Sequence, residues 1–499
     1  MLKLSRLSAF AALTVLILLV QVTAFAGNGQ SQEPSAGNAD KAQTSKSTKK
    51  RKKKKVTTAT PVAVFAAPVF SAQTPAPVVV KSVAITPTEA APAPRNTASA
   101  ARANTGVYVS PSGTPVETAA SAGQLIISEF RVRGPNGAND EFIEIYNKSG
   151  ADHTVSAASG TGYGIAASDG TTRCSIPNGT VIPNRGHYLC VNSVGYSLAS
   201  YPAGNGTTAT GDATYTTDIP DNAGIALFNN NSGGGSYILA NRIDAVGSTS
   251  EANTLYKEGT GYSALTPFSI DYSFYRDTCG KGGSITTLGG CDLGGNPKDT
   301  DNNAADFIFV DTNGTSAGAG QRLGAPGPEN LSSPIQRNAS ISAVVLDTCA
   351  AAAAPPNRVR DFTSDPANNS TFGTLDIRRT FTNNTGGNVT RLRYRVMDLT
   401  TFPAPSGFAD LRPRTSTAIV VTVDRPPCGS GTSNVTVQGT TLEQPPSQPN
   451  GGGFNSSLSS GTVTLATPLA NGASIDVRFL LGIQQTGTFK LNVNIEALP

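Results

Sequence analysis

Histidine is the residue type most often used as a general base and is a frequent metal ligand, so a Ser-His-Asp triad or a zinc-hydrolase site would need one. The 499-residue chain holds two histidines, His153 and His187. His153 falls in a turn-like segment and His187 opens an apparent strand, so both positions suit structural roles. The sequence has no H-E-x-x-H zinc motif and no G-x-x-x-x-G-K-[ST] phosphate loop. We therefore predict no catalytic residue, no cofactor and no metal ligand, and expect a protein that is not an enzyme.

Loop carboxylates offer a second kind of chemistry, calcium binding. Residues 299–310 begin like an EF-hand loop, but Ala304 stands where glycine is needed and Val310 stands where a bidentate glutamate is needed. These two departures exclude an EF-hand. Four aspartates of the region could still form an irregular calcium site or could cap turns, and the sequence leaves both possibilities open: Asp299, Asp301, Asp306 and Asp311.

Two groups of positive residues could bind an anionic polymer, because ammonium and guanidinium groups pair with phosphate, sulfate and carboxylate. The first is a run of seven cations: Lys49, Lys50, Arg51, Lys52, Lys53, Lys54 and Lys55. Subtracting these seven charges from the net charge of +4 leaves about −3 for the rest of the chain. The second group is an alternating stripe of Arg391, Arg393 and Arg395, expected on an exposed sheet face. A solvated charge block and an ordinary polar face are the respective alternatives.

The N-terminus is typical of an export signal. Lys3 and Arg6 precede an apolar run that ends in Ala24-Phe25-Ala26, a small-x-small cleavage site. The run is shorter than the roughly 20 residues that span a bilayer. We therefore predict a signal peptide over residues 1–26, no transmembrane helix after its cleavage, and an extracellular, cell-surface or periplasmic location. Residues 27–120 are rich in Ala, Pro and Thr without a regular period, which predicts a disordered basic tether.

Export permits disulfide bonds, and the six cysteines follow one another as three sequential pairs. Six cysteines allow 15 connectivities, so nearest-neighbour pairing is an inference from spacing alone. We expect the first pair to lie at the two ends of a hairpin. The predicted pairs are Cys174 with Cys190, Cys279 with Cys291, and Cys349 with Cys428.

The elements that must position these residues are short strands joined by turns. The chain holds 52 glycines and 33 prolines, and apolar residues alternate over segments such as 125–130 and 141–147. Alternation continues at 391–396, at 475–483 and at 489–495, and the last two segments predict a C-terminal hairpin. The predicted fold is all-β, with two immunoglobulin-like β-sandwich domains over 121–330 and 335–499, each with its own core.

Several motifs of the first predicted domain carry a resemblance to a known family. They include Ser128-Glu129-Phe130, Asp140–Asn147, Ile182-Pro183-x-x-Gly186-x-Tyr188-Leu189, Gly224–Asn229, Ile243–Gly247 and Ser273–Arg276, and they end with 299–307 and Gly324–Asn330. In this order they resemble a bacterial lamin-tail domain, over roughly residues 122–330. The resemblance implies an immunoglobulin-like sandwich that serves as an interaction module.

The sequence thus favours a secreted or cell-surface, non-catalytic binding or adhesion protein built on a lamin-tail-like domain. Its expected partner is an envelope polymer or a protein ligand, and an anionic polymer is expected to bind through the basic tether. Two alternatives remain open. One is an accessory component of a secreted hydrolase or nuclease system, and the other is a structural matrix protein.

Overall fold

The computed structural model describes residues 108–109, 115–116, 123–264, 269–278, 295–314, 321–402 and 407–499. The predicted signal peptide, the run Lys49–Lys55 and the pair Cys279–Cys291 lie outside these residues. Within the predicted tether, β1 (Tyr108–Val109) and β2 (Pro115–Val116) form an antiparallel pair. Residues Ala100–Pro499 form one compact unit, and it is nearly all β, as predicted. Its described part contains one short α-helix, α1 (Asn303–Asp306).

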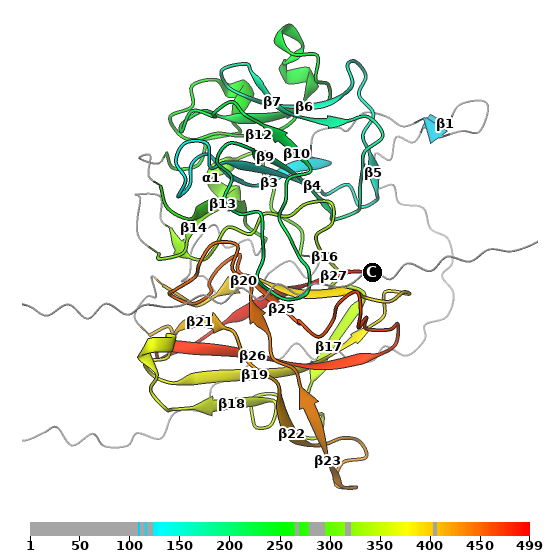
Figure 1. The fold of residues 1–499 in the computed structure, drawn as a ribbon, viewed down its shortest axis with the longest axis vertical. Helices are drawn as coiled ribbons and strands as arrows, with labels where there is room; N and C mark the ends of the chain where they lie inside the picture. Colours follow the sequence, from blue (N-terminus) through cyan, green and yellow to red (C-terminus); the bar gives the residue numbers. More distant parts are fainter. Residues whose placement is uncertain are drawn as a thin grey trace, which may run out of the picture. The chain divides into compact units, whose positions relative to one another are not determined.

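The first pair of sheets is coloured cyan to green in Figure 1. The larger sheet, sheet A, has seven strands in the order β10 (Ala213–Tyr215), β9 (His187–Asn192), β4 (Phe142–Asn147), β3 (Leu125–Arg131), β13 (Tyr272–Arg276), β14 (Phe307–Asp311) and β15 (Arg322–Leu323). Sheet B has four strands, β12 (Arg242–Val246), β11 (Ile225–Phe228), β6 (Gly162–Ala167) and β7 (Thr172–Pro177). The remaining elements here are two short strands, β5 (His153–Thr154) and β8 (Val181–Ile182), and three 3-10 helices, η1 (Gly234–Ser236), η2 (Leu239–Asn241) and η3 (Thr254–Tyr256).

Alternate side chains of sheets A and B meet in one core, as period-two pleating requires. Leu125 and Ile143 come from sheet A, and Ile165 and Ile225 come from sheet B. A disulfide joins Cys174 of β7 to Cys190 of β9. The two cysteines therefore cross-link opposite sheets instead of closing a hairpin, because β7 pairs with β6 whereas β9 pairs with β4 and β10.

Glu141, beside the first residue of β4, is fully buried and makes this core sensitive to pH. Its carboxylate accepts hydrogen bonds from Asn192 Nδ2 (2.9 Å) and from the Ile219 amide (2.8 Å), but burial raises its pKa to about 8. The ordinary pKa of a glutamate is 4.5. Between this pH and about pH 8, the folded chain therefore keeps a proton on Glu141 that the unfolded chain releases.

We expect this proton to make the free energy of unfolding fall as the pH rises through that window, by at most about 1.4 kcal/mol per pH unit. Below this pH window the Glu141 proton contributes fully to the free energy of unfolding, and above the window that contribution is lost. Glu141→Gln should flatten the fall. Urea denaturation at pH 5, 6.5 and 8 measures the slope, and equal slopes in both proteins would contradict the assignment.

The second pair of sheets is coloured yellow to red in Figure 1. Sheet C has the order β16 (Ile335–Gln336), β27 (Leu491–Leu498), β20 (Arg391–Leu399), β25 (Ser457–Ser459) and β24 (Thr441–Leu442). Sheet D has the order β17 (Ile341–Val345), β19 (Thr374–Asn383), β26 (Ser474–Gln485) and β21 (Asp410–Arg414), with β18 (Arg358–Asp361) also on β19. Beside them lie the two-stranded ribbon of β22 (Ile419–Asp424) and β23 (Thr432–Val437), and η4 (Pro366–Asn368).

The predicted C-terminal hairpin is wrong. β26 pairs with β19 and β21, whereas β27 pairs with β20 and β16, so the two strands belong to opposite sheets. Alternation fixes which residues face the core but not which strand is the neighbour, and both arrangements bury the same side chains. The second disulfide joins Cys349, beyond the end of β17, to Cys428 in the connection between β22 and β23.

The two pairs of sheets are not independent, because sheet A and sheet C also face each other. A third apolar cluster combines Tyr275, Ile308 and Val310 of sheet A with Val396 and Phe454 of the later residues. Strands β3 and β4 are buried along their whole length, and β20 is buried from its second residue onward. Sheets A and C are therefore covered on both faces, so each sheet pair has an apolar cluster of its own and the third cluster, which was not predicted, joins the two pairs.

A glycine lies at a close approach of these two sheet pairs. Gly324 forms a parallel bridge with Phe454, and a Cβ atom at Gly324 would lie 2.2 Å from the Phe454 carbonyl oxygen. Gly324→Ala should therefore force the backbones apart and lower the free energy of unfolding by about 1–3 kcal/mol. Gly235→Ala is the matched control, because a Cβ there meets nothing within 4 Å. Equal unfolding midpoints for the two variants would show that this approach is not tight.

Candidate functional site

The candidate site is a polar cavity between sheets A and C. Its volume is about 60 Å³. That is enough for an ion with a few water molecules but far below the several hundred Å³ of a typical small-molecule pocket. The residues that line the cavity include Glu129, Glu144, His187, Tyr275, Glu329 and Arg395.

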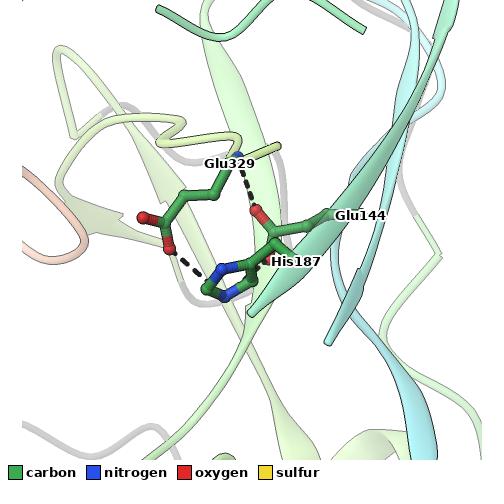
Figure 2. Close-up of side chains that lie close together, drawn as sticks. All are labelled: Glu144, His187 and Glu329. Carbon is green, nitrogen blue, oxygen red and sulfur yellow. Dashed lines mark hydrogen bonds and ion pairs between the residues drawn. The ribbon is translucent and has the colours of Figure 1, made fainter. Parts of the chain in front are cut away.

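Three potential ligand groups converge at this cavity. Glu144 projects from β4 and His187 from the neighbouring strand β9, while Glu329 comes from the segment that leads to β16 (Figure 2). His187 Nε2 lies 3.2 Å from Glu329 Oε2 and 3.8 Å from Glu144 Oε1. All three side chains are buried, and their ligand atoms lie within 4.8 Å of one another. One imidazole and two carboxylates form a donor set that proteins use for zinc and related metals.

Hydrogen bonds fix both carboxylates of this group. The Glu329 amide donates to Glu144 Oε2 at 2.7 Å, and the Ser128 hydroxyl donates to Glu144 Oε1. Arg393 Nη2 donates to Glu329 Oε1, and Arg395 Nη2 lies 3.2 Å from the same oxygen. These contacts leave Glu329 Oε2 directed at the imidazole.

Arg393 and Arg395 are the stripe that the sequence placed on an exposed polyanion-binding face, and that prediction is wrong. Their exposed fractions are 0% and 5%. Both contact Glu496 of β27, at 2.7 and 3.0 Å. The alternation was right, but the face opposite the core of sheets C and D is covered by sheet A. Arg391, the remaining member of the stripe, is half-buried.

Burial determines the protonation states around the cavity. Burial raises the pKa of Glu144 well above its ordinary value, and the neighbouring Glu129 raises it further. Burial also raises the pKa of Glu129, although Arg395 opposes this effect. Burial lowers the pKa of His187 well below its ordinary value, and Arg395 and Arg393 lower it further. The imidazole is therefore neutral at physiological pH, which is the state that can act as a general base or donate a lone pair to a metal.

A second acidic cluster surrounds Arg276 of β13. Arg276 Nη2 donates to Asp244 at 2.8 Å, and Nη1 lies 3.2 Å from Asp299 and 3.4 Å from Asp306. The single guanidinium pairs with all three carboxylates and occupies the centre of the cluster, so we interpret it as a buried ion-pair network.

The four aspartates considered for calcium do not meet at one point. Asp299 and Asp306 face Arg276, whereas Asp301 is exposed. Asp311 accepts a hydrogen bond from the Asn313 amide at 3.0 Å, as expected of a turn-capping residue. The other histidine, His153 on β5, lies 3.2 Å from the Tyr163 hydroxyl through Nε2.

The convergence of Glu144, His187 and Glu329 was not predicted from the sequence. The three residues lie far apart in the chain, and nothing in local spacing brings them together. One signal was available, because the segment from Phe307 to Val310 is continuously apolar. A continuously apolar strand indicates burial on both faces, and here it would have predicted a covering layer over this face.

Comparisons with known proteins add nothing to this assignment. No protein-family model, no curated protein and no solved structure matches the chain. The lamin-tail resemblance therefore stays a prediction. Within the described ranges no helix has both the length and the apolar character to cross a bilayer. The two disulfides are typical of exported proteins.

Proposed function

We propose that this chain is an exported, non-catalytic binding protein of the cell surface that attaches to an anionic polymer through Lys49–Lys55. The location of positive charge carries the proposal. Arg393 and Arg395 are buried and paired, as is Arg276, so these guanidinium groups are not available to a polymer. The seven cations at 49–55 account for the whole positive excess, because the net charge of +4 minus these seven charges leaves about −3 for the rest of the chain. Seven consecutive cations concentrate the positive charge in one short segment of the sequence, which favours a salt-sensitive contact with an anionic polymer.

The compact unit supports a binding role over catalysis. The cavity that collects His187 and its carboxylates is small and lies between two sheets. A layered stack with two disulfides suits a protein that must keep its surface intact outside the cell. The resemblance to lamin-tail domains agrees with an interaction module, although a fold alone does not establish an activity.

The test is binding of the chain from residue 27 onward to immobilised polyphosphate over 0.05–0.5 M NaCl. We expect the logarithm of affinity to fall linearly with the logarithm of the salt concentration. Deleting residues 49–55 should weaken binding at least tenfold. Deleting the neutral residues 56–62 instead shortens the chain equally and should have no effect.

Binding that ignores both salt and the 49–55 deletion would overturn the attachment mechanism. Turnover of DNA, phosphoesters or peptides by the purified chain with Mg²⁺ or Ca²⁺ would overturn the non-catalytic assignment, provided that Glu144→Gln removes it.

A further inference from the structure

We propose that Glu144, His187 and Glu329 bind one divalent transition-metal ion, with zinc as the representative, at the interface between sheets A and C. The donors are His187 Nε2, Glu144 Oε1 and Glu329 Oε2 (Figure 2). A nitrogen donor favours zinc and its neighbours over calcium and magnesium, which prefer oxygen alone.

The spacing of the donor atoms suits such an ion. Zinc bonds of about 2.0–2.2 Å in tetrahedral directions place ligand atoms about 3.3 Å apart. The two distances from His187 Nε2, 3.2 and 3.8 Å, lie close to this value. All three ligand atoms lie within 4.8 Å of one another, and the hydrogen bonds to Glu144 Oε1 and Oε2 hold that carboxylate beside the imidazole. The remaining coordination position would face the cavity of about 60 Å³, which has room for water.

The charge of the interface is a second and independent argument. Two buried guanidinium groups, Arg393 and Arg395, face an excess of buried carboxylates. These are Glu129, Glu144, Glu329, Glu443 and Glu496. Buried charges of one sign must be neutralised by protons or by a cation. With all five carboxylates ionised the excess is three negative charges, and a divalent ion between Glu144 and Glu329 would neutralise two of them in place of protons.

Two polar atoms at the cavity also indicate a polar occupant. His187 Nδ1 and the Tyr275 hydroxyl are buried and have no hydrogen-bond partner among the described residues. The exposed fractions of the two residues are 7% and 4%. Buried polar groups are normally paired, and leaving them without partners is costly unless water serves them. Because His187 Nδ1 points away from Nε2, hydration water and not the ion itself would serve it.

A metal ion at this site would cross-link the two sheet pairs. Its ligands connect two strands of sheet A with the segment that leads to sheet C. Arg393 and Arg395 already hold the other oxygen of Glu329 from sheet C. Outer hydrogen bonds of this kind orient metal ligands. Metal binding should therefore stabilise the contact between the two sheet pairs.

The test uses the chain from residue 27 onward, stripped with a chelator and titrated with ZnCl2 by calorimetry. We expect one equivalent to bind and to raise the melting temperature. His187→Ala should weaken binding about 100-fold or more and abolish the rise, and Glu329→Gln should weaken binding in the same direction. His153→Ala is the matched control, because His153 is the other of the chain's two histidines, and it should bind like the wild type.

Labelling histidine with ¹⁵N keeps the test decisive even if a variant fails to fold. The wild-type spectrum then contains ring-nitrogen signals from two residues, and zinc should shift those of His187 alone. No binding by the folded wild type, a shift confined to His153, or equal affinity for MgCl2 would each overturn the proposal.

Discussion

Arg393→Ala is expected to lower the free energy of unfolding by about 3–5 kcal/mol, the cost typical of breaking a buried ion pair from one side. Arg393 is fully buried and contacts Glu329, Glu443 and Glu496. Removing its guanidinium leaves these buried carboxylates facing one another without their counter-charge. Urea denaturation followed by circular dichroism measures the loss.

Arg391→Ala is the matched control for this variant. Arg391 begins the same strand, and its side chain is half-buried, so we expect a much smaller change. Equal losses would indicate that the effect arises from the strand and not from the ion-pair network. In the double variant Arg393→Ala/Glu443→Gln the loss should be smaller than the sum of the single losses, because one of the uncompensated charges is gone.

This network also shows where inference from sequence succeeds and where it stops. The alternation of Leu392 and Tyr394 with Arg393 and Arg395 correctly separates the two faces of β20, because pleating depends only on local geometry. Whether the arginine face meets water is decided by sheet A, whose strand β4 lies more than two hundred residues earlier in the chain. Arginine is rarely buried, so an exposed face was the natural prediction. Here buried glutamates pair with Arg393 and Arg395 and allow both side chains to be buried.

The candidate site could not be predicted from the sequence either, because it also depends on contacts between segments that lie far apart in the chain. His187 was expected in a strand, and it lies in β9. Its partners are Glu144 across a strand pair and Glu329 in a connecting segment, and neither pairing follows from spacing. The cysteines show the intermediate case. Nearest-neighbour pairing anticipates Cys174–Cys190, but the role of that bond as a link between sheets depends on the strand order.

The second disulfide leads to the other large expected effect. Replacing Cys349 and Cys428 together by serine should lower the free energy of unfolding by about 4–5 kcal/mol, because the bond closes a loop with a sequence separation of 79. The separation for Cys174 and Cys190 is 16, and the same double replacement there should cost about 3 kcal/mol. Urea denaturation of both variants at one pH compares them directly.

The location of the Cys349–Cys428 bond predicts a local effect besides this global one. Cys428 lies in the connection of the β22–β23 ribbon, and the ribbon packs on a small apolar cluster with Leu346, Val421, Val423 and Val437. A ribbon with so few apolar contacts should open first when its covalent link is removed. Limited proteolysis should therefore cut the variant within residues 424–432 well below its melting temperature, while the Cys174/Cys190 variant stays intact there. Cleavage at the same rate in both variants would show that the apolar cluster alone holds the ribbon in place.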